Sequence, residues 1–112
     1  MENQHRKISG YRELSQEEVD LMNRIKAKGT ELLQLQAELA NHLLDQRQKK
    51  AIASENGQQA AVHEFVRFSR AEPERWAAIG KTDIQTGIMA LVRAVAQPSE
   101  ARSTPTKEEA PQ

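Results

Sequence analysis

Apolar residues follow a helical period through the first half of the chain. They recur at steps of three, four and seven residues, which places them on one face of a helix: Val19, Met22, Ile25, Leu32, Leu35, Leu39 and Leu43. Such a helix of about 40 residues is roughly 60 Å long, whereas a compact domain of this size has a radius of gyration of about 13 Å. One partner helix of the same chain cannot cover that stripe, so we expect burial between chains.

Local signals bound and interrupt this long helix. Ser15 and Glu18 form the S-x-x-E pattern of a capping box, which predicts a helix start near Gln16. The Asn56-Gly57 dipeptide predicts its end. Gly29 interrupts the apolar stripe, and we expect a bend or a close helix contact there.

The second half of the chain predicts a returning helix. Residues 58–72 carry a small apolar cluster that either extends the first helix or forms the turn of a hairpin. Pro73 is favoured at a first helical position and Pro98 ends the next helical pattern. The fold class is therefore all-α: a long bent helix with an antiparallel C-terminal helix, forming a helical hairpin.

Composition divides the chain into three parts. Residues 1–14 form a basic N-terminal arm, and residues 15–98 form the helical domain. Residues 99–112 are rich in Pro, Ser, Thr and charge, which is typical of a disordered tail.

The returning helix has two different faces. We expect a packed face, on which the two glycines allow close backbone approach: Trp76, Gly80, Ile84, Leu91 and Val95, with Gly87 nearby. The other face combines arginines with neutral groups and no acid: Arg75, Thr82, Gln85, Thr86, Met89 and Arg93. Such a face suits an anion or a polar ligand, and a solvated helix surface is the alternative.

Composition excludes several classes of function. The net charge is zero and the pI is near 6.8, which argues against a general nucleic-acid-binding protein. Cysteine is absent, so disulfides and thiolate catalysis are excluded. The three histidines lack metal-ligand spacing and no phosphate loop is present. Neither a signal peptide nor a membrane span is visible. We expect a soluble intracellular protein without catalytic activity, metal or cofactor.

The only tyrosine, Tyr11, lies on the basic arm. An aromatic ring can stack on a nucleobase, which contributes about 1–3 kcal/mol per base. Gly10 lets the arm bend, and Lys26 and Lys28 can place charge near a phosphate. In a two-fold dimer the set is doubled, which matches a ligand with two bases and two phosphates. The alternative is that Tyr11 packs on its own helix.

Two stretches carry a family resemblance. HRKISGYRELSQEEVDLMNRIKAKG and RWAAIGKTDIQTGIMALVRAVAQP closely resemble the phage anti-CBASS nucleotide-sponge family, second type. The second stretch also resembles a hairpin segment of a phage family that sequesters cyclic ADP-ribose signals. The resemblance covers roughly residues 5–98.

This resemblance implies a compact, non-catalytic homohexamer that acts in the host bacterial cytoplasm. Such proteins bind cyclic dinucleotides, for example 3′,3′-cyclic GMP–AMP (3′,3′-cGAMP), in pockets shared by two protomers. They also hold cyclic trinucleotides on three-fold axes, and they block the activation of host-killing effectors. Metal, membrane, DNA and RNA are not expected partners.

By position, the resemblance assigns base stacking to Tyr11 and a ligand contact to Lys26. Arg67 is a weaker match for a phosphate contact and would come from a partner chain. Gly10, Arg12 and Lys28 complete the predicted dinucleotide set. For a trinucleotide site, the polar face of the last helix nominates Arg75, Thr82, Gln85 and Arg93.

Other functions predict different binding behaviour. A sponge for cyclic ADP-ribose isomers would use the shared hairpin with a different pocket. A small helical regulator of DNA or RNA would bind through its basic arm, with an affinity that falls steeply with salt. A structural coiled-coil protein would bind no nucleotide.

Overall fold

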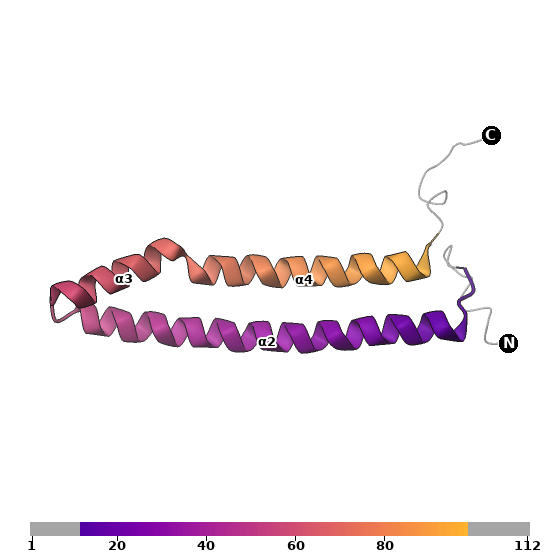
Figure 1. The fold of residues 1–112 in the computed structure, drawn as a ribbon, viewed down its shortest axis with the longest axis horizontal. Helices are drawn as coiled ribbons and strands as arrows, with labels where there is room; N and C mark the ends of the chain where they lie inside the picture. Colours follow the sequence, from indigo (N-terminus) through magenta and orange to yellow (C-terminus); the bar gives the residue numbers. More distant parts are fainter. Residues whose placement is uncertain (1–11, 99–112) are drawn as a thin grey trace, which may run out of the picture. The chain divides into compact units, whose positions relative to one another are not determined.

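The computed structural model describes residues 12–98, which fold entirely into helices and their connections (Figure 1). The helices are α2 (Gln16–Ser54), α3 (Gln59–Ala71) and α4 (Pro73–Ala96). The predicted all-α class and helical hairpin are confirmed. The arm residues Gly10 and Tyr11 and the tail 99–112 lie outside the described residues.

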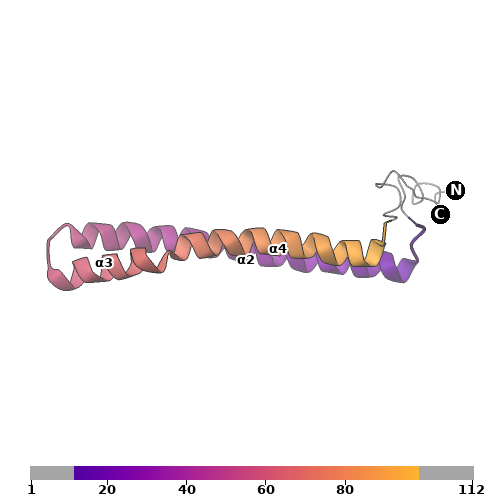
Figure 2. The same cartoon turned by 90° about the horizontal axis from the view of Figure 1, so that it is seen from above.

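The chain forms two compact units. The terminal unit comprises Met1–Lys28 with Gly87–Gln112, and the central unit comprises Gly29–Thr86. Within the central unit, α3 and the start of α4 run back alongside α2 (Figures 1 and 2). Within the terminal unit, the start of α2 lies beside the end of α4.

The start of α2 is fixed by the predicted capping box. The Glu18 backbone N–H donates to Ser15 Oγ at 3.1 Å, and the Ser15 N–H donates to Glu18 Oε1 at 2.9 Å. Two N–H groups that a helix start leaves unpaired are thereby satisfied. The helix continues through Gly29, which is buried.

The end of α2 also follows the sequence. The helix stops at Ser54, and the Gly57 N–H donates to the Ser54 carbonyl at 3.0 Å. Gly57 has a φ of 77°, a left-handed conformation that glycine adopts without strain. The Asn56-Gly57 stop signal is therefore confirmed.

Residues 58–72 contain a separate helix, α3 (Gln59–Ala71), which is neither the extension of the first helix nor the hairpin turn that the sequence allowed. α3 ends at Ala71, and the following cap residue, Glu72, has a φ of 52° that turns the chain. Pro73 then occupies the first position of α4, as predicted. The return path to the end of α4 is thus a pair of helices with a sharp turn between them.

A small cluster in the central unit packs α3 and α4 against α2. Phe68 is only 4% exposed, and the cations of Arg47 and Lys50 lie 5.1 and 5.8 Å from its ring centroid. Lys50 also pairs with Glu64 at 2.9 Å. Gln36 Nε2 donates to the Ala77 carbonyl at 3.0 Å, which ties α2 to α4 farther along.

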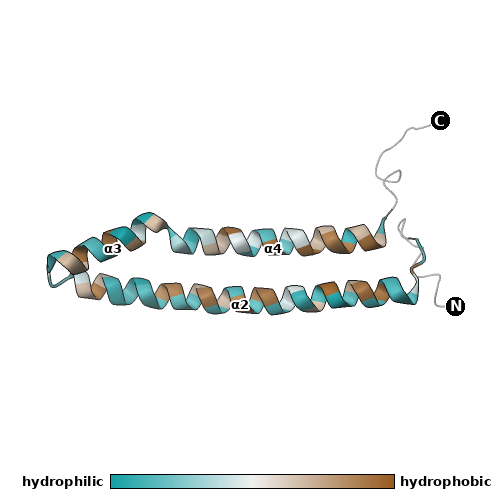
Figure 3. Ribbon diagram, in the orientation of Figure 1, coloured by the Kyte–Doolittle hydropathy of each residue, from teal (hydrophilic) through white to brown (hydrophobic). Residues whose placement is uncertain are grey.

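The hydrophobic core of the single chain is thin. Among the described residues, the buried apolar side chains are those of Leu43, Phe68, Ala77 and Ala96. Figure 3 shows apolar residues recurring along α2 and α4 between hydrophilic ones. Much of the predicted stripe is exposed, since Leu35 is 59% exposed and Leu32 and Leu39 are 47% and 45% exposed.

The predicted packed face of α4 requires a correction. Trp76 and Leu91 are 58% and 56% exposed, so the single chain does not bury them. A Cβ added at Gly80 or Gly87 would meet no atom within 4 Å. The expected close backbone approach at these glycines is therefore wrong within residues 12–98 of one chain, because no neighbouring segment in this range lies over them.

Candidate ligand-binding site

A pocket of about 550 Å³ lies within the terminal unit. It is formed by the segment before α2, the first turns of α2 and the last turns of α4. Its lining residues are Arg12, Leu14, Met22, Lys26, Ile88, Met89, Val92, Arg93, Ala96 and Pro98.

The pocket combines apolar walls with positive charge. Aliphatic and methionine side chains make most of the lining, and Arg12, Lys26 and Arg93 add three cations. No carboxylate is among the described residues that line the pocket, although Glu18 pairs with Arg12 at 2.7 Å. Apolar walls with a few convergent polar groups are typical of small-molecule sites. Cationic side chains on apolar walls suit an anionic ligand that also has apolar surface.

Lys26 is the lysine best placed for such a ligand. It follows Met22 by one helical turn, so both side chains lie on the pocket side of α2. Its side chain is exposed and forms no ion pair with another described residue. Lys28 also lies on α2 but is not among the residues that line the pocket.

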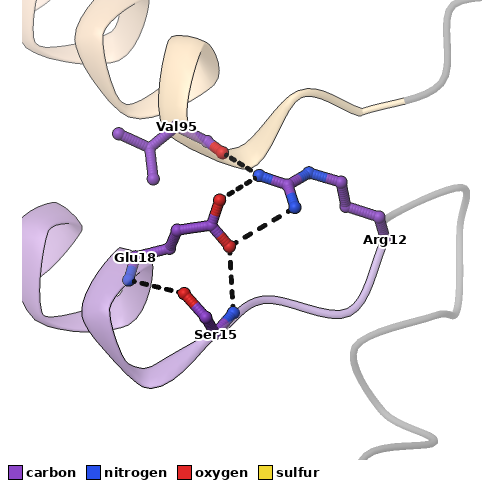
Figure 4. Close-up of polar contacts among 4 residues, drawn as sticks. All are labelled: Arg12, Ser15, Glu18 and Val95. Carbon is purple, nitrogen blue, oxygen red and sulfur yellow. Dashed lines mark hydrogen bonds and ion pairs between the residues drawn. The ribbon is translucent and has the colours of Figure 1, made fainter.

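Arg12 is held by contacts to both helices of the terminal unit (Figure 4). Its Nη2 donates to Glu18 Oε2 at 2.7 Å and to the Val95 carbonyl at 2.8 Å. Its Nη1 donates to Glu18 Oε1 at 3.3 Å. Val95 belongs to the last turn of α4, where carbonyls have no partner within the helix. Arg12 therefore links the end of α4 to the start of α2 through hydrogen bonds.

Glu18 is the acceptor at the centre of this network. The hydrogen bond from Arg12, followed by that from the Ser15 backbone, lowers the pKa of Glu18 to about 2. Glu18 thus stays ionised across the physiological range and keeps the guanidinium in place. Arg12 Nε is buried and has no hydrogen-bond partner among the described residues.

The structure changes how the predicted residues are grouped. Lys26 and Arg12, nominated for a dinucleotide, line one pocket together with Arg93, nominated for a trinucleotide. Tyr11 and Gly10 lie outside the described residues, although the peptide bond places Tyr11 next to Arg12.

Sequence reasoning missed the apolar walls of this pocket. Leu14, Met22, Ile88 and Val92 were not nominated as site residues, and the structure places them in its lining. Met22 lies four residues before Lys26, and Ile88 lies four residues before Val92. This spacing places each pair on one face of its helix and could have indicated a shared site. The sequence did not indicate which face of each helix meets the other.

Arg67 lies in the central unit and is already paired within α3. Its Nη2 and Nε donate to the two oxygens of Glu64 at 2.6 and 2.8 Å. Arg67 and Lys50 together lower the pKa of Glu64 to about 2. Arg67 is not among the described residues that line the pocket of Lys26, so its phosphate contact, from a partner chain, stays a prediction.

The other trinucleotide candidates also lie in the central unit. Arg75 Nε donates to Glu72 at 3.0 Å, and its guanidinium lies 4.9 Å from the ring centroid of Trp76. Thr86 Oγ donates to the Thr82 carbonyl at 2.9 Å, within the helix. Glu72, the C-cap residue of α3, thus pairs with Arg75 at the beginning of α4, a contact that the sequence did not indicate. Gln85 is exposed on the same helix.

A second groove, of about 520 Å³, lies within the central unit. Its lining is almost wholly apolar: Leu32, Leu35, Gln36, Leu39, Leu43, Pro73, Trp76, Ala77, Gly80 and Ile84. This groove has no charged lining residue, so its surface is suited to another protein surface rather than to an anion.

Residues 12–98 lack the features of a metal site and of a membrane span. No group of three or more histidine or acidic side chains in this part could hold a metal ion. None of its helices combines the length and apolar character that a membrane span requires.

Two comparisons with known proteins give similarities over most of the chain. The family model described as "Acb2/Tad1, hairpin domain" matches residues 5–96, a range that includes both Tyr11 and Lys26. The chain is also 58% identical over 105 residues to "Anti-CBASS protein 2" of Pseudomonas phage JBD67. That alignment covers 88% of this chain and 97% of the relative.

Proposed function

Because the chain belongs to the Acb2/Tad1 hairpin-domain family, we propose that it is a phage anti-CBASS protein that binds cyclic oligonucleotide signals. Membership confirms the family resemblance that two sequence stretches predicted. By holding the signal without cleaving it, the protein prevents activation of the host effectors. It acts in the cytoplasm of the infected bacterium.

The pocket of the terminal unit is the observation that carries this proposal. Lys26, Arg12 and Arg93 are the charged residues among the described residues that line its apolar walls, and the charge of Arg12 is paired with Glu18. Tyr11 is adjacent in sequence to one of these cations. A cyclic dinucleotide offers the complementary groups, two anionic phosphates and two flat bases.

Each component of the ligand has a match in this proposal. The ring of Tyr11 stacks on a base, which is worth about 1–3 kcal/mol. Lys26 places its ammonium near a phosphate as a point charge. Met22, Ile88 and Val92 provide apolar surface against which the base packs. We propose 3′,3′-cGAMP as the first ligand to test.

The proposed assembly is a homohexamer in which the pocket is shared by two protomers. Its support is the open apolar groove of the central unit, where Leu35 and Trp76 are 59% and 58% exposed. A second copy of the chain that covers this groove buries the apolar stripe that the single chain leaves exposed. Arg67 would then reach a ligand from the partner.

Cyclic trinucleotides are the proposed ligands of a separate site on a three-fold axis. The polar groups of α4 that support it are Thr82 and Gln85, with Arg75 at the start of the helix. Arg93 is the fourth candidate, although it lines the pocket of Lys26. Copies of these residues from three chains would surround a three-fold symmetric ligand.

Native mass spectrometry with 3′,3′-cGAMP tests the proposed function. The expected result is a hexamer carrying several ligands, which heat releases chemically intact, as chromatography shows. A cleaved product would overturn the non-catalytic role. A ligand panel with cyclic ADP-ribose isomers and cyclic trinucleotides tests specificity, and binding of an ADP-ribose isomer alone would favour the other branch of sponge proteins.

A further inference from the structure

We propose that Arg93 binds one phosphate of a cyclic dinucleotide while Lys26 binds the other, in the pocket of the terminal unit. The inference rests on the proposed function for the class of ligand. It assigns Arg93 to the dinucleotide pocket and removes it from the trinucleotide candidates of α4.

The two cations enter the pocket from different helices. Lys26 lies on α2 and Arg93 on α4, and both line the space of about 550 Å³. On each helix a methionine of the lining precedes the cation by one turn: Met22 before Lys26, and Met89 before Arg93. Each helix therefore contributes one cation beside apolar surface.

The third lining cation, Arg12, is paired within the chain. Its guanidinium donates to both carboxylate oxygens of Glu18 and to the Val95 carbonyl, so a ligand phosphate would have to compete with Glu18 for it. Lys26 and Arg93 are the other cations among the described residues that line the pocket. With one on each helix, they match the two phosphates of a cyclic dinucleotide.

The alignment of the two helices places these cations at different levels of the pocket. One guanidinium contacts both Glu18 of α2 and Val95 of α4, so these two positions lie at about the same level. The start of α2 and the end of α4 run antiparallel (Figures 1 and 2), which puts Lys26 near the level of position 87. At 1.5 Å per residue, Lys26 and Arg93 are then about 9 Å apart along the helix axes. This separation suits two anionic groups on different sides of one ligand.

Arginine and lysine bind phosphate in different ways, so the contribution of Arg93 can be divided. The planar guanidinium donates two parallel hydrogen bonds to the free oxygens of a phosphodiester, whereas an ammonium acts as a point charge. Arg93→Gln removes both the charge and this paired geometry. Arg93→Lys removes the geometry alone.

Calorimetry with 3′,3′-cGAMP tests the assignment. Arg93→Gln should weaken binding about tenfold or more, because a charge-assisted contact is lost. Arg93→Lys, which keeps the charge, should bind more tightly than Arg93→Gln. Circular dichroism should show the helix content of the wild type in both variants. Unchanged affinity of a folded Arg93→Gln protein would overturn the inference.

Two ligand analogues identify the group that Arg93 contacts. In each, one of the two phosphodiesters of 3′,3′-cGAMP is replaced by a neutral methylphosphonate. The wild type should bind both analogues about tenfold more weakly than 3′,3′-cGAMP, because one cation loses its partner. Arg93→Gln should bind at least one analogue as tightly as it binds 3′,3′-cGAMP, since that phosphate already lacks its contact. A further tenfold loss for both analogues would refute a phosphate contact by Arg93.

Arg24→Gln is the matched control. Arg24 is an exposed arginine on α2 in the same terminal unit, and it lies beside Glu17 and Asp20 outside the pocket. Its loss should change the affinity less than about twofold at physiological salt, which screens exposed charges. Equal losses in Arg24→Gln and Arg93→Gln would indicate general electrostatic attraction and contradict the inference.

Two further outcomes separate this inference from the proposed function. Loss of cyclic trinucleotide binding by Arg93→Gln, with unchanged affinity for 3′,3′-cGAMP, would place Arg93 at the three-fold site. The inference would then be wrong and the proposed function would stand. A wild-type protein that binds no cyclic oligonucleotide would overturn the proposed function, and the inference with it.

Discussion

Arg47 of α2 engages Glu74 of α4 through both carboxylate oxygens, with distances of 2.6–2.9 Å. The same guanidinium lies over the ring of Phe68 and reaches Ser69 Oγ at 3.4 Å. One side chain of α2 thus contacts the end of α3 and the beginning of α4. These contacts hold the turn at Glu72 against α2 within the central unit.

Replacing Phe68 with alanine should strongly destabilise the protein. Phe68 is 4% exposed, and truncation of a buried phenylalanine typically costs about 3–5 kcal/mol. Urea unfolding followed by circular dichroism measures the loss. Val66→Ala on the same helix is the control, because Val66 is 39% exposed and should change stability far less. Equal losses in the two variants would contradict the assignment of Phe68 to the core.

Tyr11→Ala and Lys26→Ala should each weaken binding of 3′,3′-cGAMP and leave the assembly intact. Loss of one stacked ring is expected to cost about 1–3 kcal/mol, which is a five- to more than hundredfold rise in Kd. Calorimetry measures the affinity and native mass spectrometry the assembly. Lys49→Ala serves as a control, because Lys49 pairs with Asp45 on an exposed part of the central unit. The pocket assignment fails if both variants bind as the wild type does.

Acid should destabilise the protein between about pH 4.5 and 2. Glu18 and Glu64 have a pKa of about 2 in the folded chain, against 4.5 for a free side chain, because arginine hydrogen bonds favour the carboxylates. The unfolded chain therefore binds protons first as the pH falls, and stability declines over this window. Above about pH 5 these two groups contribute no pH dependence.

Thermal unfolding at a series of pH values measures this effect. The Glu18→Gln and Glu64→Gln variants should each show a shallower decline of Tm between pH 4.5 and 2 than the wild type. Parallel curves for all three proteins would show that other carboxylates control the acid transition.

Leu35→Glu should disrupt the proposed hexamer. Leu35 is 59% exposed in the single chain and lines the apolar groove of the central unit, so a charge there would be buried without a partner on assembly. Light scattering after gel filtration should show a species smaller than the wild type. The control is Glu38→Gln, which lies on an exposed part of α2 outside the groove. A monomeric wild-type protein would contradict the assembly itself.

Deletion of residues 99–112 should leave binding and assembly unaltered. The segment is rich in Pro, Ser, Thr and charge and has little apolar surface with which to form an interface. Native mass spectrometry of the truncated chain with 3′,3′-cGAMP compares both properties in one measurement. Loss of either would assign the tail a role.

Local signals predicted the helix ends better than they predicted the packing. Ser15 with Glu18, the glycine at position 57 and the proline at position 73 act within a few residues, so the sequence alone indicated each boundary. The amphipathic pattern likewise predicted a long α2. Residues 58–72 stayed ambiguous because an apolar cluster of that length fits both a helix extension and a turn.

The candidate site depends on contacts that sequence spacing does not encode. Lys26 and Arg93 lie on different helices. The hydrophobic pattern does not determine how these two helices are aligned, so the two residues were predicted to contact different ligands. The bond from Arg12 to Val95 joins residues 83 positions apart. Its acceptor is a backbone carbonyl, which every residue possesses, and no motif distinguishes it.

The separation of Arg12 and Val95 along the chain also affects the order in which contacts form during folding. Residue 12 is synthesised before Val95, and their bond forms only after both turns of the hairpin have brought α4 back. Contacts of such long sequence separation are slow to form. The pocket of the terminal unit is therefore a late product of folding: a chain that ends before Val95 can cap α2 but has no carbonyl there for Arg12 to hold.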